Sequence, residues 1–247
     1  MKKLYYKKIL PIVVVLLFAI LLGFLQCKVL AVKFEHICSL ENYYPDLYDF
    51  LSYVLVGDNV GHIFYLAKND MGLMFQPLSF LVFGLFIAGF NFLAKPRGYY
   101  QFVYTRKDKE KTFVNGIFKE QISLIFIYSA VYYASVFVCG YIYGYEITKW
   151  DKILTAMLLG MVSKIVFFVV IKVIVLYVFL RRGVTDSILT GIILVVTVLM
   201  LDVAIECKGI NLLLFSSEFN FLGMLLLVIL GTVIHCINRK IDLLKLD

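Results

Sequence analysis

Apolar residues gather into six long runs along this chain, and shorter polar or charged segments separate the runs. Each run is close to the roughly 20 residues that an α-helix needs to cross a bilayer. We therefore predict an all-α, polytopic membrane protein with six transmembrane helices in one domain over residues 1–247. The predicted spans are residues 9–30, 73–94, 122–143, 153–180, 187–205 and 221–237.

The composition supports a membrane protein. Hydrophobic residues make up 62% of the chain and the mean hydropathy is +0.91, whereas soluble domains are about 45–50% apolar. The first apolar run is too long for the core of a cleaved signal peptide, which is short and ends in small residues. We interpret it as a retained helix.

The distribution of Lys and Arg predicts the orientation. With the N-terminus inside, 16 of the 24 basic residues lie on the inner side, six on the outer side and two within a span. Because basic flanks resist translocation, both termini should be cytoplasmic. The net charge of +7 is then a topology signal, and we expect no nucleic-acid partner.

The outer segment between the first two spans, residues 31–72, is the longest on that side. The pair Pro45-Asp46 favours a turn or a helix start. Apolar residues then recur at the spacing of a short amphipathic helix, at Leu47, Phe50, Leu51 and Val54. Two interpretations remain open: a cap packed over the bundle, or a lid that contacts substrate.

Motifs for catalysis and metal binding are missing from the sequence. It contains no Walker A sequence, no His-Glu-x-x-His and no Gly-x-Ser-x-Gly. The histidines His36, His62 and His235 are too far apart to suggest a shared metal site. None of the five cysteines has CxxC spacing, although a disulfide between Cys38 and Cys207 is possible. We expect neither enzymatic activity nor a cofactor in this chain.

Ionisable residues inside the spans are the best candidates for function, because charge in lipid is costly. Lys164 lies near the middle of the fourth span, and Lys172 follows about two helical turns later. Both are expected on an inward face, where they could contact an anionic or polar part of a substrate. Alternatively, they snorkel or pair with a carboxylate. Asp202 is a possible partner and the third candidate for the substrate pathway, although it should differ in depth from Lys164.

The predicted cytoplasmic loop 95–121 combines aromatic and basic residues. Tyr100, Val103 and Tyr104 fall at i, i+3 and i+4, which makes one apolar stripe on a helix. Arg106 and Lys107 follow directly. The pattern indicates a short amphipathic helix that lies on the membrane surface or in a partner's groove.

The six-span layout and this loop resemble the permease subunit of an ABC transporter, in the class of small six-helix exporters of bacterial peptide export and bacteriocin immunity. The specific part is Tyr104-Thr105-Arg106-Lys107, followed by Phe113 and Phe118. The resemblance implies that the loop is a coupling helix in a groove of a separate ATPase subunit, which binds ATP and Mg²⁺. It also implies a second permease copy or a sister permease, and the bacterial cytoplasmic membrane as location.

The expected function is therefore export or expulsion of a peptide or another amphipathic substrate. An alternative is a membrane immunity or sensor protein that binds a peptide without transporting it. A membrane enzyme is a third possibility, which the missing motifs disfavour.

Overall fold

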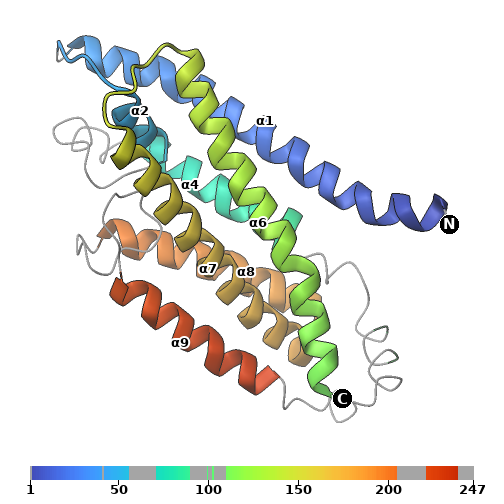
Figure 1. Ribbon diagram of the computed structural model, residues 1–247. Coiled ribbons are helices and arrows are strands. Elements are labelled where there is room, and N and C mark those ends of the chain that lie inside the picture. Colours follow the sequence, from blue (N-terminus) through green and yellow to red (C-terminus); the bar gives the residue numbers. More distant parts are fainter. Residues whose placement is uncertain are drawn as a thin grey trace.

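The fold is a bundle of long helices (Figure 1). The computed structural model describes residues 2–40, 42–55, 71–89, 99, 102, 110–204 and 221–238, and at several helix ends it describes the backbone alone. All regular structure in these ranges is helical, which confirms the all-α prediction. The elements are α1 (Lys2–Leu40), α2 (Leu47–Val54), α4 (Met71–Gly84), the π-helical turn η1 (Leu85–Gly89), α6 (Glu110–Ile142), α7 (Trp150–Arg182), α8 (Val184–Ala204) and α9 (Phe221–Asn238).

Two helices, α1 and α6, are much longer than the apolar runs that predicted them. Helix α1 continues to Leu40, ten residues into the segment expected to be an outer loop. Its buried residues Ala31, Phe34 and Cys38 keep helical spacing there, so this stretch packs into the bundle. Helix α6 begins at Glu110, inside the predicted loop 95–121. In both cases the helix continues through polar residues beyond the apolar run, so the end of the run does not mark the end of the helix.

Four helices in the described part of the chain are long and apolar enough to cross a membrane. Their candidate spans are Leu10–Leu40, Ile122–Ile142, Trp150–Arg182 and Val184–Leu201. Helices α4 and α9 contain shorter apolar stretches. The structure therefore supports a membrane protein, while the number of six crossings and the side on which the termini lie remain predictions.

Helix α6 runs between α1 and α7, and α8 and α9 both pack on α7 (Figure 1). Helix α4 lies among α1, α6 and α8 in the same figure, and it packs on α6 and α8. Helix α2 lies at one end of the bundle, with the turn of residues 143–149. We call this the capped end. The N-terminal end of α1 lies at the opposite end.

Helix α2 is a buried cap, which matches one of the two interpretations of residues 31–72. All eight of its residues are buried, so it is enclosed on every side and has no solvated face. Aromatic rings hold it in place. Phe50 stacks on Tyr145 at 4.6 Å between ring centroids, and its edge meets Phe34 of α1 at 5.7 Å. The expected amphipathic surface helix is therefore an interior element.

Asp46 starts α2 and also fastens it to the turn before α7. Its Oδ1 accepts a hydrogen bond from the backbone N–H of Asp49 at 2.9 Å, and the Asp49 carboxylate accepts one from the backbone N–H of Asp46 at 3.1 Å. This reciprocal capping box satisfies backbone donors that a helix start leaves unpaired. The Asp46 Oδ2 accepts from Thr148 at 2.6 Å and lies 2.8 Å from Lys149 Nζ.

These contacts set the ionisation of the capped end. Burial opposes the charged form of Asp46, but hydrogen bonds from Lys149, Thr148 and the Asp49 N–H outweigh it and lower the Asp46 pKa. The hydrogen bond to Asp46 raises the Lys149 pKa. The Tyr43 hydroxyl donates to the Asp49 carboxylate at 2.7 Å, and this bond raises the Tyr43 pKa.

We predict that Asp46→Ala lowers the free energy of unfolding by about 1–2 kcal/mol, because the helix cap and a charge-assisted hydrogen bond are lost together. Glu146→Ala is the matched control: its side chain is exposed, and the backbone carbonyl that accepts from Leu47 N–H is kept. Denaturant unfolding in detergent measures both. Equal effects of the two changes would contradict the assignment of Asp46 as the fastening residue.

The Asp46 contribution should also depend on pH with a definite sign. Because the folded state lowers the Asp46 pKa, its stabilisation is present above the unfolded-state value of about 3.9 and is lost as the pH falls through the folded value. The stability difference between wild type and Asp46→Ala should thus shrink only in acid below about pH 4.

Candidate functional site: a polar and aromatic cluster inside the bundle

The structure places the predicted pathway lysines in the interior of the bundle. Lys164 is 2% exposed and Lys172 is fully buried, and both lie on α7. Asp202 lies in α8, in a part described by its backbone. The predicted coupling residues Tyr100, Val103, Tyr104, Arg106 and Lys107 lie outside the described residues. The roles of all these residues therefore stay predictions. Among them, Lys164 has described neighbours from which a candidate site can be defined.

Lys164 lies close to the middle of α7, about 21 Å along the axis from Trp150. Its Nζ is 5.5 Å from the centroid of the Tyr133 ring on α6. A cation at this distance from an aromatic face is attracted by the ring's quadrupole. A lysine at the centre of a spanning helix costs roughly 2.5–3.5 kcal/mol to insert. The interaction with Tyr133 offsets part of this cost.

A chain of polar side chains crosses the bundle beside Tyr133. The Tyr132 hydroxyl on α6 donates to Oε1 of Gln26 on α1, and Gln26 Nε2 donates to Ser79 Oγ on α4 at 2.6 Å. Three helices are therefore joined by side-chain hydrogen bonds within apolar segments. Such bonds hold helices together in lipid because hydrocarbon offers no alternative partner.

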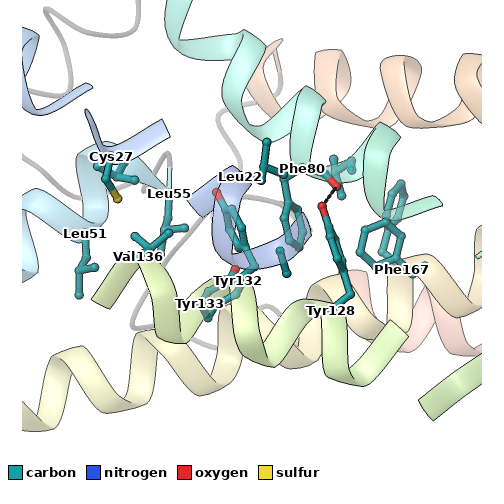
Figure 2. Packing of buried hydrophobic residues seen from close by; sticks show 14 of the residues in the cluster. Leu22, Cys27, Leu51, Leu55, Phe80, Tyr128, Tyr132, Tyr133, Val136 and Phe167 are labelled. Atoms are coloured by element: carbon teal, nitrogen blue, oxygen red, sulfur yellow. Dashed lines mark hydrogen bonds between the residues drawn. The ribbon is translucent and has the colours of Figure 1, made fainter. Parts of the chain in front are cut away.

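Phe80 of α4 lies at the centre of the aromatic side chains (Figure 2). Its ring centroid is 4.2 Å from Tyr132, 5.1 Å from Tyr128, 5.7 Å from Phe168 and 6.4 Å from Tyr133. The Tyr128 hydroxyl also donates to the Phe80 backbone carbonyl at 2.9 Å, the dashed line in Figure 2. The polar chain and the aromatic rings thus form one cluster that joins α1, α4, α6 and α7.

The local backbone of α4 makes room for these rings. A Cβ atom at Gly84 would lie 2.6 Å from both Phe168 Cζ and Tyr128 Cε1. Only a residue without a side chain fits between the two rings. The π-helical turn η1 begins directly after Gly84, and such turns are frequent at functional sites.

Helices α7 and α8 form a hairpin around Gly183, which bears on the proposed partner of Lys164. Lys164 and Asp202 each lie 18 residues from the helix end next to that glycine. At about 1.5 Å per residue, both are about 27 Å along their helices from the turn. Lys164 and Asp202 therefore lie at similar depths along the two helices, and Asp202 stays a candidate partner of Lys164.

Gln26, Tyr132 and Phe80 were not among the predicted site residues. A sequence signal existed in part: Gln26 is a single amide within an apolar run, and Tyr128 and Tyr132 are four residues apart on one helix face. Phe80 carries no such signal. An aromatic residue in an apolar run looks the same whether it faces lipid or a cluster.

We predict that Tyr132→Phe lowers the free energy of unfolding by about 1 kcal/mol, because the Gln26 carbonyl loses its hydrogen-bond donor. Tyr133→Phe is the matched control. The Tyr133 hydroxyl is buried without a hydrogen-bond partner in the described structure, and the phenylalanine ring still lies beside Lys164. Thermal unfolding in detergent measures both, and an equal loss in the two variants would contradict the polar chain.

The cluster combines an ammonium group, an amide, hydroxyls and aromatic faces in one place inside the bundle. These groups can bind the carboxylate, amide and apolar parts of an amphipathic molecule. Comparison with protein-family models, curated proteins and solved structures gave no match for this chain. Functional assignment therefore rests on this cluster and on the pattern of the sequence.

Proposed function

We propose that this chain is the membrane-spanning permease subunit of an ATP-driven ABC transporter of the small six-helix exporter class, located in the bacterial cytoplasmic membrane. The observation that supports it most is the buried Lys164 in a polar and aromatic cluster at mid-length of a membrane helix. An ionisable group at this depth is expensive and marks substrate or ion pathways.

In this proposal the cluster is the substrate site of a closed state. Lys164 binds an anionic or polar group of the substrate, and the rings around Phe80 hold its apolar side chains. A peptide carries both kinds of group. The α2 cap closes one end of the bundle, so substrate release requires movement of α2 or of the helices that enclose it.

The proposed arrangement has six spans with both termini in the cytoplasm, supported by the 16 basic residues on one side. The capped end then faces outward. ATP and Mg²⁺ bind to a partner ATPase, and a second permease copy or a sister permease completes the pathway. Loop 95–121 provides the coupling contact.

The coupling contact gives the direct test of this function. Tyr104→Ala should abolish co-purification of the ATPase, because a buried aromatic anchor commonly contributes about 2 kcal/mol or more to an interface. Lys109→Ala should have a small effect, since a charge at the rim mostly tunes the association rate. The measurement is the amount of P-loop ATPase retained on the tagged, detergent-solubilised chain.

Two outcomes would change the proposal. Retention of the ATPase by a Tyr100→Ala, Tyr104→Ala double variant would reject the coupling helix. If no P-loop protein binds the wild-type chain, the alternative stands: a membrane immunity or sensor protein that holds a peptide in the same cluster without transport.

Lys164→Met tests the substrate site itself. The change keeps most of the side-chain volume but removes the charge, so stimulation of ATP hydrolysis by substrate should fall at least about tenfold, while ATPase binding is kept. Lys152→Met is the control, since Lys152 lies on the same helix and is exposed. If Lys164→Met loses stability and keeps stimulation, Lys164 is structural.

A further inference from the structure

Helices α7 and α9 pack side by side and leave a groove between them. It lies on the face of α7 that points away from Lys164. Its volume is about 270 Å³. The lining is almost entirely aliphatic, with Ile165, Val169 and Val173 on α7 and Val228 on α9, and Thr232 and His235 add the polar groups. Both helices belong to apolar segments, so a groove with this lining suits an apolar chain.

The shape of the groove is held by close contacts at its floor and at one end. A Cβ atom at Gly231 would lie 2.9 Å from Val170 Cγ2, so α9 approaches α7 closely because residue 231 is a glycine. The side-chain amide of Asn238 donates to the Val173 carbonyl at 2.9 Å and ties the end of α9 to α7. The groove is therefore a fixed feature of the packed helices.

One ridge of α7 leads from the groove to a positive charge. Ile165, Val169, Val173, Tyr177 and Arg181 are each four residues apart, and such positions form a continuous ridge on a helix. The Arg181 guanidinium lies 4.9 Å from the centroid of the Tyr177 ring. Along this ridge, aliphatic side chains give way to an aromatic ring and then to an exposed cation.

The dimensions of the ridge match those of a bilayer leaflet. Ile165 lies near the middle of α7, and Arg181 follows 16 residues later, about 24 Å along the helix axis. Half of a bilayer, headgroups included, measures about 20–22 Å. A modestly tilted α7 therefore carries Arg181 at headgroup level when Ile165 is at the midplane. Tyr177 falls at the interface, where tyrosine is enriched.

We propose that this groove binds an anionic phospholipid, with one acyl chain along Val169 and Val173 and the phosphate on Arg181. The charge at the end of the ridge selects this occupant. A zwitterionic lipid fills the same groove but gains less from the guanidinium, which favours phosphate groups with net negative charge. A helix from a second copy is about 10 Å across and leaves the cation without a partner.

The test uses the full-length protein in detergent and two probes with identical chains, dioleoyl-phosphatidylglycerol and dioleoyl-phosphatidylcholine. Native mass spectrometry measures the lipid bound at each concentration. The wild type should bind phosphatidylglycerol about tenfold more tightly, as expected for one charge-assisted contact. Arg181→Gln should reduce this preference to near unity, whereas the neighbouring Arg182→Gln, which is off the ridge, should keep it.

Thr232→Trp tests the groove separately from the charge. The Thr232 side chain is exposed at the rim, so a tryptophan can cover the groove without entering the helix contact, and binding of both lipids should fall. The proposal is overturned if Arg181→Gln and Arg182→Gln behave alike, or if Thr232→Trp leaves lipid binding unchanged. It is also overturned if Thr232→Trp converts a dimer into a monomer, which would assign the groove to a second copy.

Discussion

A polar side chain inside an apolar bundle has to find its partner within the protein, and this requirement ties three helices of the fold together. Gln26 on α1 receives a hydrogen bond from Tyr132 on α6 and donates one to Ser79 on α4. In a bilayer none of these groups can turn to water. The register of α1 against α4 and α6 is thereby specified, and the aromatic rings around Phe80 pack in the space that this register leaves.

Polar contacts also determine the position of α2. A helix start leaves N–H groups without partners inside the helix; here the Asp46 carboxylate accepts from the Asp49 N–H, and the Glu146 carbonyl accepts from the Leu47 N–H. The second carboxylate oxygen of Asp46 accepts a hydrogen bond from Thr148 and forms an ion pair with Lys149. One carboxylate therefore both starts the cap helix and holds it to the turn before α7. This explains how a helix of only eight residues stays buried in one place.

The two faces of α7 serve different purposes in our proposals. Lys164 points toward α6 and contributes a charge to an interior cluster, whereas the ridge that ends at Arg181 borders a groove beside α9. The cost of burying a charge explains why the first feature needs neighbours on several helices. An arginine at the end of a span reaches the headgroups and needs no such support.

The sequence by itself determined the helical class and the membrane environment. Long apolar runs favour lipid, and in lipid a helix satisfies every backbone N–H and C=O within one segment. It also predicted a short helix from the spacing of Leu47, Phe50, Leu51 and Val54, since helical periodicity is a local property, but it left open whether this helix is a cap or a lid. Only the tertiary structure decided that this cap is enclosed and that Lys164 meets Tyr133. It alone placed Phe80 among four rings, because the partner of a side chain depends on which helices pack together.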